Sequence, residues 1–319
     1  MTENTEKNVL KLKLTSSPHI HSNWSTNKVM WMVVLSLIPC VISSVVFFGF
    51  YQLLIILTSV GFAVGTEYAI RVFRKQENTI KDGSAIITGL LLALILPPNF
   101  SLSSTAIGAV VSIGIGKEVF GGLGFNIFNP ALVGRAFLQA AFPVPMTTWL
   151  KPNFAVDGVS SATPLSAFKF DKILTDLNPM LIGNTGGSLG ETSAIAVLIG
   201  GVFLIAIGIV NWRIPVSILA GVFVFSGIFN IFGNYPDPVF QIFAGGLLFG
   251  AFFMATDWVT SPITSKGMWI YGFGIALMLV IVRLFGGLPE GVMYSILFMN
   301  GLVPLINKFT RPVIFGEAV

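Results

Sequence analysis

Thr163 has the most specific capacity for chemistry of any residue in this sequence. It precedes Pro164, and a threonine followed by proline has the form of a helix N-cap with proline at the first helical position. The free N–H groups and positive dipole end of such a helix would stabilise a phosphate ester on the threonine hydroxyl. Ser160, Ser161 and Ala162 are small and would leave the hydroxyl open to a modifying enzyme. An ordinary capped turn is the alternative interpretation.

Two asparagines form a second candidate site. Asn126 and Asn129 lie three residues apart, on one face of a helix, and Pro130 follows the second. Because proline removes a backbone donor and frees carbonyl groups, this stretch could present amides and carbonyls to the polar edge of a heterocycle. The alternative is that both amides cap and satisfy a broken helix.

Charged side chains in or beside apolar segments form a third set. Such charges are costly in a membrane and face a partner or an aqueous path. The candidates for an ion pathway are Glu118, Asp257, Glu290 and Arg135, and Arg135 could pair with one of the acids. Interhelix salt bridging is the alternative role for this set. Glu67 lies one turn before Arg71, so we predict an ordinary i,i+4 ion pair for that acid.

The composition predicts a polytopic membrane protein that positions these groups. Of 319 residues, 54% are hydrophobic and 10% are charged, and the mean hydropathy is +0.85. Soluble domains carry about 25% charged residues. A net charge of +4 reflects the asymmetry of the loops described below, so no nucleic-acid partner is expected. The single cysteine, Cys40, and two histidines, His19 and His21, do not suffice for a disulfide, an iron–sulfur site or a protein-only metal site.

Ten apolar segments are expected to be membrane helices. They cover about 29–49, 52–72, 83–97, 103–120, 127–142, 192–211, 214–233, 239–255, 268–285 and 291–310. Pro97–Pro98 and Asn129–Pro130 bound or break two of the shorter ones. With the N-terminus in the cytoplasm, thirteen Lys and Arg residues fall on the inner side and four on the outer side. Both termini are therefore expected in the cytoplasm.

The spans divide into two sets of five around one long polar loop. An odd number of helices in each half predicts two inverted five-helix repeats. Thr88–Ala93 resembles Gly245–Gly250, and Phe128–Val133 loosely resembles Met299–Pro304. The predicted organisation is a cytoplasmic arm (1–28), a first half (29–142), an extracytoplasmic loop with the attachment site (143–191), a second half (192–310) and a cytoplasmic tail (311–319).

The residues around Thr163 resemble a known attachment signal. Asp157, Ser160, Ala162 and Thr163 are spaced as in the flavinylation signal, which reads Asp, two residues, Ser or Thr, usually Gly, then Ala and Thr. Ser161 stands where glycine is usual, so the position keeps a small residue. On this signal a flavin transferase joins FMN through its phosphate to the threonine.

Further strings along nearly the whole chain resemble one family of membrane subunits. They are Ser17–His19, Asp82–Ser84, Thr88–Gly89, Gly116–Gly122, Asn126–Phe137, Met254–Asp257 and Pro289–Gly291. The family includes the D subunit of the Rnf ferredoxin:NAD⁺ oxidoreductase and the B subunit of the sodium-pumping NADH:quinone reductase. The chain lacks the longer N-terminal extension of the latter, so it resembles the former more closely.

The resemblance implies a membrane flavoprotein subunit of an ion-translocating, electron-transferring complex in a bacterial or archaeal cytoplasmic membrane. It implies covalent FMN on Thr163, and a noncovalent riboflavin at the position of Asn126 and Asn129. Partner subunits of an Rnf complex and a flavin transferase are also implied. The chain is not expected to be catalytic alone, because it has no nicotinamide or iron–sulfur motif. The coupling ion, Na⁺ or H⁺, stays open.

A different class of function also suits the predicted fold. Two inverted halves with broken helices are typical of secondary transporters, so a transporter or channel for a small polar solute is the alternative. A structural scaffold that docks redox subunits is a third option.

Overall fold

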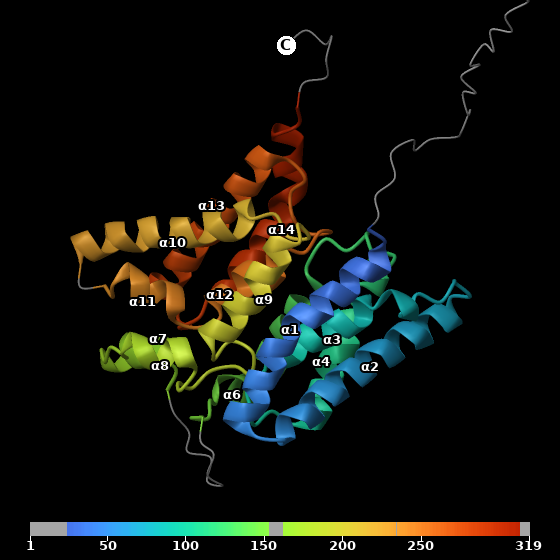
Figure 1. The fold of residues 1–319 in the computed structure, drawn as a ribbon, viewed down its shortest axis with the longest axis horizontal. Helices are drawn as coiled ribbons and strands as arrows, with labels where there is room; N and C mark the ends of the chain where they lie inside the picture. The colour runs from blue at the N-terminus through green and yellow to red at the C-terminus, as the bar shows by residue number, and fades with distance from the viewer. Residues whose placement is uncertain (1–23, 153–161, 234, 313–319) are drawn as a thin grey trace, which may run out of the picture.

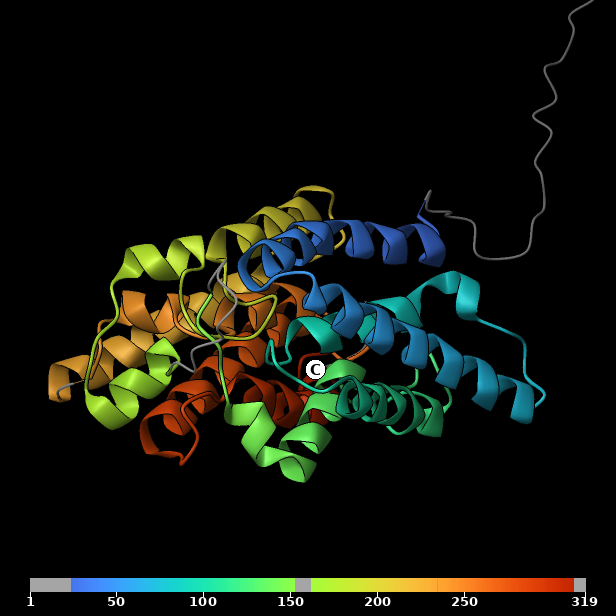
Figure 2. The same ribbon diagram turned by 90° about the horizontal axis from the view of Figure 1, so that it is seen from below.

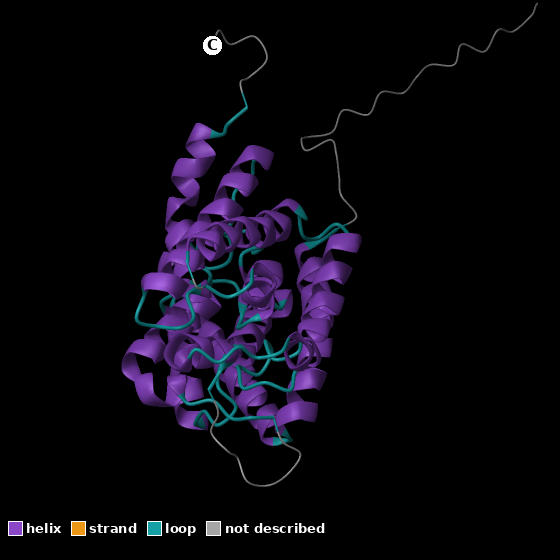
Figure 3. Cartoon of the chain, turned by 90° about the vertical axis from the view of Figure 1, so that its left-hand side faces the viewer, coloured by secondary structure: helices purple, strands orange, loops and turns teal. Residues whose placement is uncertain are grey.

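The computed structural model describes residues 24–152, 162–233 and 235–312, and over these residues the secondary structure is helical with no β-strand (Figure 3). The predicted all-α class is confirmed. Asp157 and Ser160 lie outside the described residues. So do both terminal segments, which include His19 and His21.

The first half contains five main helices. They are α1 (Thr26–Phe48), α2 (Tyr51–Phe73), α3 (Ser84–Leu94), α4 (Leu102–Gly114) and α5 (Pro130–Ala141), with the short turns η1 (Ile80–Asp82) and η2 (Glu118–Phe120) between them. Ser25 caps the start of α1, and Gly49, with φ of 88°, ends it. At about 1.5 Å per residue, the 23 residues of α1 are enough to cross a bilayer core.

The second half repeats this plan with a more broken third segment. Its elements are α9 (Ala194–Ala206), α10 (Arg213–Phe232), α11 (Pro238–Phe243), α12 (Leu247–Phe249), the π-helix η4 (Gly250–Met254), α13 (Ser265–Phe285) and α14 (Val292–Phe309). Gly245, at φ of 68°, takes the left-handed conformation that interrupts the segment between α11 and α12.

Each of the ten predicted apolar segments contains helix, but they differ in length. Six are long and apolar enough to cross a membrane, namely α1, α2, the run Leu102–Phe120, α10, α13 and α14. The other four are α3, α5, α9 and the interrupted run from α11 to η4. The chain is therefore a multi-pass membrane protein with short and broken helices, as predicted.

The main helices pack in a similar order in both halves. In the first half α2 packs on α3 and α4, and α4 packs on α5. In the second half α10 packs on α11 and α13, and α13 packs on α14. The halves meet where α1 contacts α9 and where α5 contacts α14.

Small residues allow the closest helix approaches in each half. Ser59 on α2 donates to the carbonyl of Gly89 on α3 at 2.6 Å, and a Cβ on Gly89 would lie 2.7 Å from the Cα of Val60. In the second half, a Cβ on Gly272 of α13 would lie within 3 Å of Ser217 on α10. Both contacts are of the small-residue type that lets membrane helices pack closely.

The bundle has two distinct ends. The terminal face is the end at which α1 starts and α14 ends, and the loop face is the opposite end (Figure 1). The loop face carries α6 (Pro143–Thr147), α7 (Pro164–Ser166), the π-helix η3 (Ala167–Asp171) and α8 (Leu177–Ile182), and it is turned toward the viewer in the view from below (Figure 2). The Thr163 segment therefore lies at the end of the bundle opposite the start of α1.

Candidate functional site

Thr163 has the backbone and side-chain geometry of a helix N-cap. Its φ and ψ are −67° and 157°, and its Oγ1 accepts a hydrogen bond from the Ser166 N–H at 3.2 Å. Pro164 is the first residue of α7. The predicted cap is confirmed. The Thr163 side chain is half-buried, and the hydroxyl lies 2.9 Å from the Ser166 hydroxyl, while Ala162 is exposed.

The segment after Thr163 is fixed to the protein by apolar packing. Leu165 is buried in a small cluster with Met180, Phe240 and Ala244, and Phe168 packs against this cluster. The rings of Phe168 and Phe240 are 6.2 Å apart. The hydroxyl is therefore held at the start of a packed element.

Two cavities at the loop face adjoin Thr163. The larger has an empty volume of about 1240 Å³, including its open mouth, and is lined by Ala162 and Ser166 on one side and by α5 and the start of α14 on the other. The smaller, of about 510 Å³ with its open mouth included, is lined by Thr163 itself. Trp149 lines both cavities. A group attached to the Thr163 hydroxyl would thus have space beside it within the protein.

A buried ion cluster lines the larger cavity. Arg135 on α5 bonds Glu191 at 3.3 Å and Glu290 at 3.1 Å, so the predicted pairing of Arg135 with one of the acids is confirmed. Glu290 also accepts from the backbone N–H of Gly246 at 2.6 Å, at the start of the α12–η4 run. This carboxylate is therefore bound both by an arginine and by a helix N-terminus.

Glu191 is a functional candidate that the sequence did not identify. It lies just before α9, with a side chain only 8% exposed, and it lines both loop-face cavities. Burial, and then the nearby Glu290 carboxylate, raise the pKa of Glu191 to about 7, although Arg135 acts in the opposite direction. The only feature of the sequence that could have indicated Glu191 is its position directly before the apolar segment 192–211.

Asn126 and Asn129 lie at the terminal face and line a different cavity, whose empty volume is about 800 Å³ with its open mouth included. The Oδ1 of Asn129 accepts from the N–H groups of Ala131 and Leu132, and its Nδ2 donates to the Met254 carbonyl at 3.2 Å. Asn129 thus caps α5 and joins the two halves, which matches the alternative role weighed for it. Asn126 donates to the Phe128 carbonyl.

Asp257 and Lys117 also line the terminal-face cavity. The Asp257 carboxylate accepts from the Thr260 hydroxyl at 3.0 Å, and burial raises the pKa of this acid. The cavity wall is otherwise mainly apolar. A mainly apolar cavity with a few convergent polar groups is typical of a small-molecule site.

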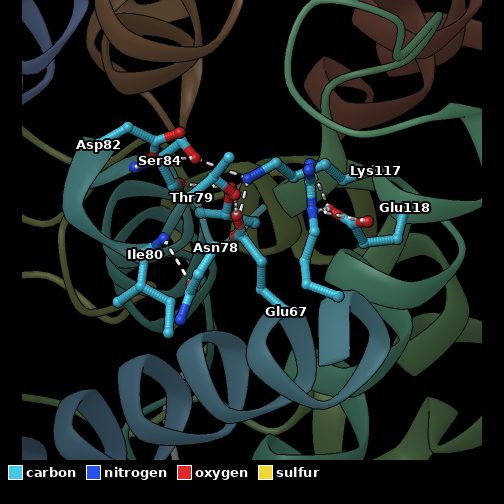
Figure 4. Close-up of polar contacts among 10 residues, drawn as sticks. Glu67, Asn78, Thr79, Ile80, Asp82, Ser84, Lys117 and Glu118 are labelled. Carbon is cyan, nitrogen blue, oxygen red and sulfur yellow. Dashed lines mark hydrogen bonds and ion pairs between the residues drawn. The ribbon is translucent and has the colours of Figure 1, made fainter. Parts of the chain in front are cut away.

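The prediction that Glu67 pairs with Arg71 is wrong. Glu67 is fully buried and bonds Lys117 at 2.8 Å, while Thr79 donates to its second oxygen at 2.5 Å (Figure 4). Arg71 instead pairs with Glu118 at 3.3 Å. A buried carboxylate needs partners at its own depth, and this need outweighs the few tenths of a kcal/mol of an exposed i,i+4 pair.

The same buried cluster fastens the start of α3. The Lys117 ammonium donates to the Ser84 hydroxyl at 2.6 Å, and Asp82 accepts from both the N–H and the hydroxyl of Ser84 (Figure 4). The N–H of Ser84 in the first half and that of Gly246 in the second therefore both donate to a carboxylate. The two carboxylates lie at opposite faces.

The structure divides the predicted site residues between the two faces. Thr163, Arg135 and Glu290 gather at the loop face, and Asn126, Asn129, Asp257 and Glu118 gather at the terminal face. Glu118 lies outside the terminal-face cavity and pairs with Arg71, while its backbone carbonyl accepts from Arg74 at 2.7 Å.

Comparison with known proteins gives one consistent family. The model of the NQR2, RnfD, RnfE family matches residues 13–316. The chain is 45% identical over 326 residues to the D subunit of the proton-translocating ferredoxin:NAD(+) oxidoreductase complex of Clostridium ljungdahlii, with 98% of this chain and 97% of the relative covered. It is 41% identical over 313 residues to the D subunit of the Na(+)-translocating ferredoxin:NAD(+) oxidoreductase complex of Acetobacterium woodii, with 97% and 96% covered. It is 38% identical over 346 residues to the D subunit of the ion-translocating oxidoreductase complex of Actinobacillus succinogenes, with 95% and 98% covered.

Proposed function

Because this chain belongs to the NQR2, RnfD, RnfE family, we propose that it is the D subunit of an Rnf-type ion-translocating ferredoxin:NAD⁺ oxidoreductase. The observation that carries the proposal is likeness along nearly the whole length to subunits of that name in two organisms. The chain acts within a multi-subunit enzyme, so other membrane and peripheral subunits are its partners. In this proposal the chain lies in the cytoplasmic membrane, and the excess of Lys and Arg on the predicted inner side favours an orientation with both termini in the cytoplasm.

We propose that the chain carries FMN joined through its phosphate to the Thr163 hydroxyl by a flavin transferase. The half-buried hydroxyl, its packed segment and the adjoining cavities fit such a group. Ser166 lies within hydrogen-bonding distance of the attachment oxygen, and Arg135, paired with Glu191 and Glu290, lines the larger cavity. When bound, FMN would supply one- and two-electron transfer, while the protein orients it and sets its potential.

We further propose that the terminal-face cavity binds a noncovalent riboflavin. Asn126, Asp257 and Lys117 provide polar groups on a mainly apolar wall. The Asn129 side chain is already engaged as a cap, so its part is to shape the wall rather than to bind the ligand. Riboflavin content of the purified complex, measured after acid release, tests this proposal directly.

Charged groups at both faces suit a role in ion movement. Glu118 and Asp257 lie at the terminal face, and Arg135 and Glu290 lie at the loop face. We propose that these residues contribute to the ion pathway of the complex. A solute transporter or channel, which is the alternative function, would also have broken helices but would need no redox partners.

The proposed function is tested by purification from native membranes. A tagged form of this chain should co-purify with further subunits and with ferredoxin-dependent NAD⁺ reduction, and ion uptake into vesicles should require that reaction. A chain that purifies alone and carries a solute without ferredoxin or NAD⁺ would favour the transporter.

Glu191→Gln should change how the flavin potential depends on pH. Well below pH 7 the Glu191 carboxyl is neutral, and as pH rises through about 7 it gains a negative charge that disfavours adding an electron nearby. The wild-type midpoint potential should therefore fall relative to that of Glu191→Gln across this range, as measured by spectroelectrochemistry. Exposed Glu77→Gln serves as the control. A pH-independent difference would rule out this role for Glu191.

A further inference from the structure

Lys169 joins the Thr163 segment to the second half of the protein. It lies on η3, six residues after Thr163, and its ammonium donates to the carbonyls of Arg283 at 3.1 Å and Leu288 at 3.0 Å, and also to that of Gly286. A lysine ammonium has three donors, so all three are used. The acceptors belong to the end of α13 and to the loop that leads into α14.

The contact is a tertiary clamp rather than a local cap. The last carbonyls of a helix have no partner within the helix, and a cation near them is favourable. Here the cation comes from a segment separated from Arg283 by 114 residues in sequence. The clamp adds a direct polar link between two segments that otherwise meet through α11, where Leu165 packs on Ala244 and Arg283 donates to the Ala244 carbonyl.

The clamped loop continues directly into the ion cluster of the larger cavity. Two residues after Leu288 comes Glu290, which bonds Arg135 and the Gly246 N–H. On the other side of the clamp, Leu165 and Phe168 fix the segment that starts at Thr163. A continuous set of contacts thus runs from Thr163 through Lys169 to the charges across the cavity.

We propose that Lys169 is a positioning residue that sets the separation between the flavin on Thr163 and the Arg135–Glu290 pair, and thereby sets the midpoint potential of that flavin. The inference rests on the proposed covalent FMN. Its physical basis is that the interaction between two charges changes with their distance, most strongly where water is excluded.

The test compares Lys169→Met with Lys172→Met in the flavin-loaded complex. Lys172 is exposed and follows η3 directly, and its ammonium lies over the Phe168 ring at 5.3 Å from the centroid without bonding the loop before α14. Lys169→Met should retain the covalently bound flavin but change the ratio of reduced to oxidised flavin at a fixed ambient potential by at least threefold. Lys172→Met should keep the wild-type ratio.

Lys169→Arg is the second variant, because it keeps the charge and replaces the three-donor ammonium by a planar fork. In Lys169→Arg we expect a ratio of reduced to oxidised flavin between those of Lys169→Met and wild type. If Lys169→Met does not fold, the ratio is measured in Lys169→Arg instead. A wild-type ratio in every folded Lys169 variant would overturn the inference. Wild-type protein without covalently bound flavin would overturn the proposed cofactor instead, so the two failures are distinguishable.

Discussion

Replacing Thr163 with valine is expected to abolish covalent flavin attachment. Valine has nearly the shape of threonine but offers no oxygen for a phosphoester, so no protein-bound flavin should survive denaturation. Loss of the N-cap hydrogen bond should cost only about 1 kcal/mol, and Leu165 should keep the segment packed. The measurement is flavin fluorescence of the protein band on a denaturing gel, from cells that contain the flavin transferase.

Ser166→Ala is the matched control for that variant. The Ser166 hydroxyl lies 2.9 Å from that of Thr163, so it is the nearest alternative hydroxyl among the described residues, and its band should remain fluorescent. A fluorescent band in Thr163→Val would show that another residue carries the flavin. A wild-type band without fluorescence would favour the transporter or scaffold interpretation.

Of the variants considered, Lys117→Met is expected to lower the free energy of unfolding the most. The change leaves the Glu67 carboxylate buried without its cation, and breaking a buried ion pair in this way costs about 3–5 kcal/mol. It also removes the hydrogen bond to Ser84 at the start of α3. Thermal unfolding of the detergent-purified protein, followed by loss of the monodisperse fraction, should shift to a clearly lower temperature than for wild type.

The double variant Glu67→Gln/Lys117→Met separates charge imbalance from lost packing. It removes both charges, so it should recover much of the stability that Lys117→Met loses. Lys81→Met, at an exposed position, should unfold like wild type. Equal stability of Lys117→Met and wild type would contradict the pairing seen between Lys117 and Glu67.

Local patterns in the sequence predicted the features that depend on local physics. Thr163–Pro164 specified an N-cap because both residues act through the backbone beside them, and the structure has that cap. The apolar segments were found because a membrane helix needs a long uninterrupted run of apolar residues. The position of Asn129 before Pro130 indicated a helix cap as one of its two possible roles, and the structure has that cap.

Partners distant in sequence could not be predicted in the same way. Glu67 was assigned to the nearest cation along its helix, but in the fold Lys117, fifty residues away, lies at the depth of the buried carboxylate. Glu191 stood at the edge of a segment, and only the packing of both halves shows that it faces Arg135 and the cavities. The Lys169 clamp likewise depends on a contact with the end of α13, which no local pattern encodes.

Peptide mass spectrometry tests the proposed covalent bond between FMN and Thr163 most directly. The wild-type protein, isolated from cells that contain the flavin transferase, should yield a proteolytic peptide spanning Thr163 with the added mass of FMN less one water. Fragmentation should place that mass on Thr163. An unmodified Thr163 peptide, or an added flavin mass on another residue, would contradict the account.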